Sequence, residues 1–187
     1  MIATAAKHCF SVDDYHRMAE AGILTEDDRV ELIEGDILPM SPIGDRHAAC
    51  VEKLADALRQ LLAGEAMVRT QNPILLGDHS EPEPDLVVVR PREDYYASGK
   101  PTADDTLLVI EVADATLDYD RRIKLPLYAR HHVPEAWLVD LVTNRVEVHR
   151  QPTPTGYQQT ERFERDQLVA STRFDQLKLA ADAILIR

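Results

Sequence analysis

The sequence of 187 residues contains only two cysteines, Cys9 and Cys50. Two cysteines cannot build a disulfide framework or a cysteine-based zinc site, so we expect both to be reduced thiols. No apolar run approaches the ~18 residues that a transmembrane helix needs, and the first ten residues lack the long apolar core of a secretory signal. The sequence therefore predicts a cytoplasmic protein that does not enter a membrane.

Positive charge is also scarce, because 21 Lys and Arg stand against 33 Asp and Glu and leave a net charge of -12. Such a chain is not expected to coat nucleic acid through its overall field. A nuclease is not excluded, since acidic residues are needed to hold a divalent cation and DNA contact can come from a local basic patch. Residues 115–132 offer such a patch, with Arg121, Arg122, Lys124 and Arg130 against Asp118 and Asp120.

The motifs of several common enzyme classes are missing. There is no glycine-rich phosphate loop, no GxSxG elbow and no dinucleotide fingerprint, which argues against nucleotide-dependent enzymes and serine hydrolases. The seven histidines show no spacing typical of a zinc site. His47 lies at the start of a predicted helix and is interpreted as a surface or capping histidine.

The sequence does contain a regular succession of apolar segments and turn signals. Its length suits one domain, residues 1–187. Helices are predicted over residues 11–21, 45–63 and 120–131, the first with a capping box of Ser11 and Asp14. Strands are predicted on either side of a Glu34-Gly35 turn and over residues 67–71, 74–76, 86–89, 106–112, 136–139, 145–149 and 157–163, with loops at 91–105 and 151–156. This order predicts an α/β protein with a central mixed sheet flanked by helices.

Three acidic residues interrupt or end apolar segments. Asp85 opens LVVV, Glu111 lies inside LLVIEV, and Asp140 closes AWLV. A carboxylate in a buried strand must be paired, protonated or bound to a metal, and strand ends are where α/β proteins build their sites. Two such carboxylates side by side would repel each other unless a cation lay between them.

Each of these residues also has a purely structural interpretation. Asp140 precedes a turn and is expected to cap it rather than to bind a metal. Asp85 follows Pro84 and could bond a loop at the start of its strand. Glu111 could pair with an arginine of the next helix, although apolar neighbours on both sides make it the hardest of the three to explain in this way.

The segment after the Glu111 strand supplies a candidate cation. Lys124 and Tyr128 are four residues apart and therefore share one face of the predicted helix. Pro126 cannot donate a hydrogen bond to the carbonyl of Arg122, so the first turn of this helix is expected to be open or bent. Lys124 would then lie near the end of the Glu111 strand, unless it is a solvated surface lysine.

Five segments in a fixed order carry a family resemblance. They are RVELIEGDILPMSPIG followed by His47, EPEPDLVVVRP, LLVIEVADATL, YDRRIKLPLYAR and VPEAWLVDL. Together they resemble the Uma-two family of restriction endonucleases over about residues 10 to 185, nearly the whole chain. That family is placed in the PD-(D/E)XK nuclease superfamily, which implies a restriction-endonuclease-like fold with a metal site on two strands of a central mixed sheet.

The resemblance implies a particular set of metal ligands. Pro84-Asp85 matches the PD element, and Glu111 matches the second acidic position. Asp85, Glu111 and the carbonyl of Val112 would then hold magnesium, or alternatively manganese, with several waters retained.

The resemblance also assigns the catalytic cation and a further carboxylate. The lysine expected two residues after the glutamate is replaced by Ala113. In the Uma-two pattern a lysine on the following helix stands in, and here that residue is Lys124. An acidic residue from the N-terminal part often completes such sites; Glu31 is the candidate, with Glu34 as the alternative, and His47 is a third residue that could complete the site.

Two hypotheses about function follow. The first is a DNA endonuclease that hydrolyses phosphodiester bonds with a metal, for which the set of Asp85, Glu111 and Lys124 argues. The second is a non-catalytic interaction module that keeps the nuclease fold, for which the net acidity and the displaced lysine argue. Nucleases that cut both strands commonly act as two-fold dimers, so a homodimer is expected.

Overall fold

The computed structural model describes residues 7–25 and 27–186. Its N-terminal part contains helix α1 (Val12–Glu20), strands β1 (Val30–Ile33) and β2 (Asp36–Pro39), and helix α2 (Asp45–Leu61). The middle part contains β3 (Met67–Thr70), β4 (Leu86–Val89), a 3-10 turn (Ala103–Asp105), β5 (Thr106–Ala113), α3 (Leu117–Tyr119), a π-helical turn (Asp120–Lys124) and α4 (Leu125–Arg130). The C-terminal part contains β6 (Glu135–Asp140), β7 (Arg145–Thr153), β8 (Gly156–Phe163), β9 (Leu168–Ala170), β10 (Lys178–Ala180) and α5 (Ala181–Ile184).

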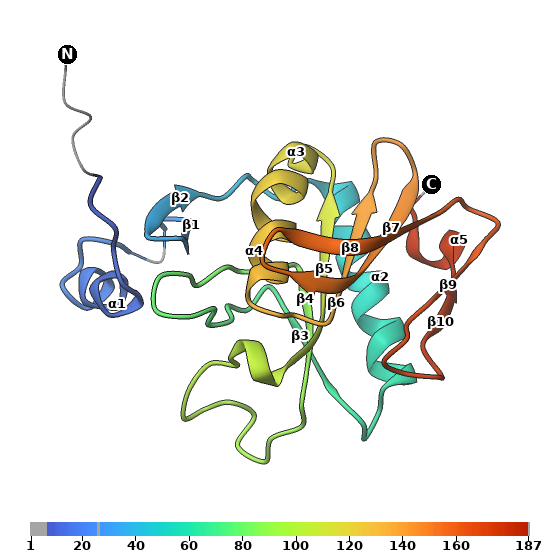
Figure 1. The fold of residues 1–187 in the computed structure, drawn as a ribbon, viewed down its shortest axis with the longest axis horizontal. Coiled ribbons are helices and arrows are strands. Elements are labelled where there is room, and N and C mark those ends of the chain that lie inside the picture. Colours follow the sequence, from blue (N-terminus) through green and yellow to red (C-terminus); the bar gives the residue numbers. More distant parts are fainter. Residues whose placement is uncertain (1–6, 26, 187) are drawn as a thin grey trace.

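Six strands form the central sheet in the order β3-β4-β5-β6-β7-β8. Strands β5 and β6 are parallel, and every other neighbouring pair is antiparallel. The predicted mixed sheet is therefore confirmed. The hairpins β1-β2 and β9-β10 form two separate two-stranded sheets, which lie on opposite sides of the central sheet in Figure 1.

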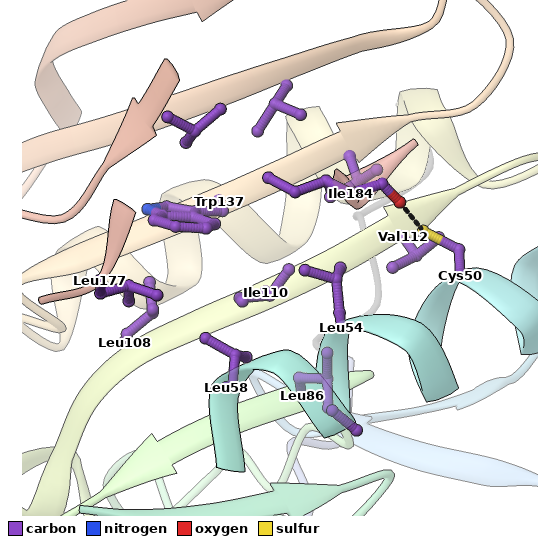
Figure 2. Close-up of a cluster of buried hydrophobic side chains, with 14 of the residues drawn as sticks. Cys50, Leu54, Leu58, Leu86, Leu108, Ile110, Val112, Trp137, Leu177 and Ile184 are labelled. Atoms are coloured by element: carbon purple, nitrogen blue, oxygen red, sulfur yellow. Dashed lines mark hydrogen bonds between the residues drawn. The ribbon is translucent and has the colours of Figure 1, made fainter. Parts of the chain in front are cut away.

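A hydrophobic cluster covers each face of the sheet. Side chains alternate between the two faces along a strand, so each strand contributes residues to both clusters. On β5, Leu108, Ile110 and Val112 pack with α2 and the C-terminal residues in one hydrophobic cluster. Figure 2 shows this cluster, with the Cys50 thiol donating to the carbonyl oxygen of Ile184 at 3.3 Å. Val109 and Ala113 belong to the cluster on the other face, which includes α4. The face that carries Val109 and Ala113 must therefore also carry Glu111.

Several predicted details are confirmed. The capping box of Ser11 and Asp14 opens α1, and β1 and β2 meet at a Glu34-Gly35 turn. Strand β4 is buried along its whole length. Strand β8 lies at the edge of the sheet, as predicted for residues 157–163.

One predicted strand is absent, and the bounds of two other predicted segments are wrong. Residues 74–76 form no strand; Leu75 makes one isolated bridge, to Thr102, and the segment is apolar because it is buried beside α4. Residues 151–156 are not all loop, since β7 continues to Thr153 against β8. The third helix begins at Leu117, before the predicted residue 120, and its second part is a π turn.

Candidate active site

Asp85 and Glu111 lie opposite each other where β4 begins. The antiparallel register pairs Leu86 with Ile110, so the next residues along the two strands are Asp85 and Glu111. Directly opposed residues of an antiparallel pair project from the same face of the sheet. Both residues line one cleft, and the structure thus brings the two predicted carboxylates together.

The Asp85 carboxylate is held at both oxygens. Its Oδ2 accepts a hydrogen bond of 2.8 Å from the N–H of Val112, and its Oδ1 lies 2.9 Å from Nε2 of His47. His47 belongs to the first turn of α2, so this contact joins the helix to the end of the sheet. The hydrogen bond to Asp85 raises the pKa of His47 above its ordinary value, although burial opposes the rise.

Glu111 is only 2% exposed. Its Oε1 accepts a hydrogen bond from the Tyr128 hydroxyl and lies 3.2 Å from Nζ of Lys124. Its Oε2 lies 3.4 Å from the backbone nitrogen of Asp85. Burial raises the pKa of the Glu111 carboxyl, and the Lys124 cation opposes the rise. Burial therefore dominates and disfavours the ionised form of Glu111, and further positive charge beside the carboxylate would be needed to restore it.

Lys124 reaches Glu111 from a π-helical turn. The N–H of Leu125 donates to the carbonyl of Asp120, five residues earlier, instead of to the residue four earlier. The open turn expected from Pro126 thus takes the form of a single π turn, a feature that occurs often at functional sites. Ala113 lies on the same face of β5 as Glu111, so a lysine at position 113 would project from the face on which Lys124 contacts Glu111.

Nζ of Lys124 is surrounded by oxygen atoms. It lies 3.2 Å from Glu111 Oε1 and 3.3 Å from Glu31 Oε2, and it donates to the carbonyl of Glu83 at 3.2 Å. Burial alone would lower its pKa, but the charges of Glu111 and Glu31 outweigh burial and raise it. Lys124 is therefore a buried cation, and the interpretation of a solvated surface lysine is wrong.

Glu31 enters the same cluster from β1. Its Oε1 accepts a hydrogen bond of 3.0 Å from the Tyr119 hydroxyl, and its Oε2 accepts one of 3.1 Å from the N–H of Glu83. Glu34 lies in the turn after β1 and pairs with Arg130 at 2.8 Å. The structure thus places Glu31 in the cleft and leaves Glu34 outside it.

The cleft has a volume of about 510 Å³. The segment from Pro39 to Gly44, which connects β2 to α2, forms one of its walls. Two residues with permanent positive charge, Arg29 and Lys124, line it together with seven carboxylate residues: Glu31, Glu83, Asp85, Glu111, Asp114, Asp118 and Asp120. Negative charge therefore dominates the cleft, and a cation is the ligand that its electrostatics favour.

Asp140 lies outside this cluster. Its Oδ1 accepts hydrogen bonds from the N–H groups of Val142 and Thr143, and its Oδ2 accepts one from the Thr143 hydroxyl. Arg121 pairs with the same oxygen at 3.2 Å. The prediction that Asp140 caps its turn is confirmed.

The basic patch expected from residues 115–132 is largely neutralised. Arg121 bridges Asp140 and Glu147, Arg130 pairs with Glu34, and Lys124 is buried among carboxylates. Arg122 alone of these four cations has no ion pair within the described residues, and it is exposed. The expected patch is therefore not a continuous basic surface.

Sequence reasoning missed one residue of the site and left another undecided. His47 was interpreted either as a surface or capping residue or as one of the residues that could complete the site, and its side chain bonds Asp85. Asp120 was counted only among the charges of the basic segment, yet it is 4% exposed and lines the cleft. The available signal was the spacing of Asp120, Lys124 and Tyr128, four residues apart, which places all three on one side of a helical segment.

The donor set fits a hard divalent cation. Magnesium is commonly held by one or two carboxylates and several waters, and Asp85 and Glu111 supply two carboxylates. Within residues 7–25 and 27–186 no cluster of three or more His, Cys, Asp or Glu side chains has metal-ligand geometry. The carbonyl of Ala113 accepts from Leu141 on the β6 side, so the carbonyl of Val112 points toward β4, where that strand has ended.

The chain is a mixed α/β protein with opposed carboxylates at one strand end and a lysine from the next helical segment beside them. A family model described as "Putative restriction endonuclease" (Uma2) matches residues 12–182. The chain belongs to this family, and its membership supports a nuclease. The predicted family and the predicted fold class are thereby confirmed.

A solved structure gives the same fold. It is described as a "putative nuclease belonging to DUF820" from Anabaena variabilis, and it matches with a TM-score of 0.72 and 21% sequence identity. The match covers 94% of this chain and 97% of that one. No curated protein matches this chain. Within the described residues no helix has the length and apolar character needed to cross a bilayer.

Proposed function

We propose that the protein is a magnesium-dependent DNA endonuclease whose active site is formed by Asp85, Glu111 and Lys124. One observation carries the proposal: Lys124 Nζ lies 3.2 Å from Glu111 Oε1, beside the strand end where Asp85 and Glu111 face each other. Two carboxylates and an adjacent lysine supply the charges that phosphodiester hydrolysis requires.

Asp85, Glu111 and the carbonyl of Val112 would hold the magnesium, which when bound polarises a phosphoryl oxygen and lowers the pKa of a coordinated water. Lys124 would contact a non-bridging phosphate oxygen and stabilise the charge that develops there. Lysine suits this role because it is a compact point charge on a flexible stem. Glu31 would act as a positioning residue, since its Oε2 lies 3.3 Å from Nζ of Lys124.

The acidity of the cleft supports the requirement for a metal. With seven carboxylate residues against Arg29 and Lys124, a DNA phosphate would meet net repulsion in the metal-free protein. A divalent cation between Asp85 and Glu111 would reduce that repulsion at the point where the scissile phosphate must bind. DNA binding and cleavage are therefore both expected to depend on magnesium or manganese.

A cleavage assay tests the proposal directly. Supercoiled, linear and single-stranded DNA are incubated with the protein in magnesium, in manganese and in chelator. Cleavage is expected with metal and not in chelator, and Glu111→Ala is expected to abolish it. Lys124→Ala should remove most of the activity, Lys124→Arg should restore little, and Arg122→Ala, which removes an exposed cation of the same segment, should retain it.

Each outcome of this assay assigns a role. If cleavage survives Lys124→Ala while Glu111→Ala abolishes it, the lysine assignment is wrong and the metal assignment stands. If the wild type cleaves none of the DNA forms with either metal, the nuclease proposal is wrong. The non-catalytic module would then be the better explanation, and the neutralised basic segment is the observation that favours it.

We also propose a homodimer, because a two-fold assembly would present two active sites to the two strands of a duplex. Light scattering at the concentration of the cleavage assay tests this. A mass of two chains is expected, and a monomeric mass under those conditions would contradict it.

A further inference from the structure

Asp120 is a buried carboxylate of the cleft to which the proposed mechanism assigns no role. It is 4% exposed, and its Oδ2 accepts a hydrogen bond of 2.6 Å from the Thr116 hydroxyl. Its Oδ1 has no hydrogen-bond partner within the described residues, and it is not among their fully buried unsatisfied atoms. One oxygen is therefore fixed by the protein, and the other remains in contact with the cleft that Asp120 lines.

The other buried carboxylates of the cleft have both oxygens engaged. Glu31 is bonded by Tyr119 at one oxygen and by the N–H of Glu83 at the other. Glu111 is bonded by Tyr128 at one oxygen and lies 3.4 Å from the backbone nitrogen of Asp85 at the other. Asp85 is likewise engaged at both oxygens.

Two further residues of the cleft, Lys124 and Glu83, fit the role of a base less well. The pKa of Lys124 is raised by Glu111 and Glu31, so this amine stays protonated and cannot accept a proton. Glu83 is half-buried, and its carboxylate has no hydrogen-bond partner within the described residues that would fix its direction. A general base must be held in a defined orientation toward the proton that it removes.

We infer that Asp120 is the general base of the reaction. This inference rests on the proposed nuclease function. Oδ1 of Asp120 accepts a proton from the attacking water, whose oxygen forms a bond to phosphorus. The bond from phosphorus to the leaving sugar oxygen breaks, and that oxygen keeps the electron pair and takes a proton from bulk water. Asp120 then returns its proton to solvent, so atoms and charge balance over one turnover.

The surroundings of Asp120 suit a base that works at neutral pH. Burial raises its pKa to about 6, while the Thr116 hydrogen bond and the Lys124 cation oppose the rise and Asp85 and Glu31 add to it. Glu111 on β5 and His47 on α2 also interact electrostatically with it. Above pH 6 the carboxylate is ionised and can accept a proton, and its affinity for that proton exceeds that of an ordinary aspartate.

The test compares Asp120→Asn with Asp118→Asn, which removes the same charge from an exposed position on the same cleft wall. Single-turnover cleavage is measured from about pH 5 to about pH 9 at saturating metal. The wild-type rate should rise with pH through about 6 and then level off. Asp120→Asn should lower the plateau by about 100-fold and lose the rising limb, whereas Asp118→Asn should keep both.

Manganese binding, measured by calorimetry without DNA, separates a base from a metal ligand. Asp120→Asn should bind manganese as Asp118→Asn does, whereas Glu111→Gln should lose binding. Thr116→Val provides a second variant should Asp120→Asn fold poorly. It removes a hydrogen bond that lowers the pKa of Asp120, so it should move the rising limb to higher pH.

Four results would overturn the inference while the nuclease proposal stands. The first is wild-type-like cleavage by Asp120→Asn, and the second is a loss of the rising part of the pH–rate profile in Glu83→Gln instead. The third is a loss of manganese binding in Asp120→Asn equal to that of Glu111→Gln, and the fourth is a pH–rate profile that Thr116→Val leaves unmoved. A wild type that cleaves no DNA would overturn both proposals together.

Discussion

Two buried glutamates on neighbouring parallel strands have opposite environments. Glu111 on β5 is 2% exposed and Glu135 on β6 is fully buried. Glu135 accepts hydrogen bonds from the indole N–H of Trp137, from Arg150, and from both the N–H and the hydroxyl of Thr172. Glu111 instead lies beside a lysine and a tyrosine at the wall of a cleft.

The difference shows that burial of a carboxylate is not by itself the mark of an active site. Glu135 is satisfied by donors from β6, β7 and the loop after β9, so it links the segment around Thr172 to the sheet, and none of its oxygen atoms is left for a ligand. Glu111 also has three donors, but one of them is the Lys124 cation and the residue lines the cleft, so a ligand of positive charge can approach it. The environment of the carboxylate therefore separates a structural role from a proposed catalytic one.

The largest effect that tests this comparison is expected on catalysis. Glu111→Gln should lower the cleavage rate by roughly a thousandfold, because the loss of a metal ligand removes several kcal/mol of transition-state stabilisation. Glu135→Gln should leave the rate per folded molecule unchanged. Single-turnover rates, corrected for the folded fraction by circular dichroism, would measure both. Equal loss of activity in the two variants would break the distinction.

The next effect concerns stability. Glu135→Ala should reduce the free energy of unfolding by about 3 kcal/mol, since it leaves the Arg150 cation buried without one of its partners. Glu161→Ala is the matched control, because it removes the other, half-exposed carboxylate partner of Arg150 and should cost about 1 kcal/mol or less. Urea unfolding measures both, and a similar loss in the two variants would contradict the central role of Glu135.

Much of the fold could be predicted from the sequence, because its signals are local. The buried run LVVV gave strand β4 with its bounds, and Ser11 with Asp14 gave the start of α1. Residues 74–76 were mispredicted because a buried apolar segment has the same sequence pattern whether or not its backbone forms a strand. Here the N–H groups of Ile74 and Leu76 donate single hydrogen bonds to a neighbouring loop and do not pair with a strand of the sheet.

The site could be predicted only where chain order and alternation fix it. Asp85 and Glu111 were found because each interrupts an apolar run, and Lys124 because a helix must start near the end of β5. His47 comes from a distant helix and reaches Asp85 only after folding. Asp120 is buried only after residues remote in sequence pack around it, so its neighbours in the sequence did not distinguish it from an ordinary surface aspartate.

A third buried strand carboxylate, Glu147 on β7, extends the comparison to pH. Its pKa is lowered to about 2 by His149 first, and then by Arg162 and Arg121. The folded-state pKa lies below the ordinary value of about 4.5, so the stabilisation is complete above that pH and is lost as the pH falls toward about 2. Because Arg162 is 67% exposed and screened by solvent, we expect a contribution of roughly 1 to 2 kcal/mol.

Urea unfolding of the wild type and of Glu147→Gln over a range of acidic pH measures this contribution. The difference between the two free energies of unfolding should be largest near neutral pH and should shrink as the pH falls below about 4.5. A difference that stays constant over the acid range would mean that the ion pairs of Glu147 contribute nothing.

The smallest effect concerns Tyr128, the neutral side chain that donates a hydrogen bond to Glu111. Its hydroxyl is fully buried and donates to Oε1 of Glu111, so it holds that oxygen while Oε2 stays on the side of Asp85. Tyr128→Phe should raise the magnesium concentration for half-maximal cleavage by about tenfold, as is typical when a partner of a metal ligand is lost. Tyr157→Phe, which removes a hydroxyl bonded to the carbonyl of Val133 outside the cleft lining, should leave the magnesium dependence unchanged. If both variants shift it equally, Tyr128 acts through general stability and does not orient Glu111.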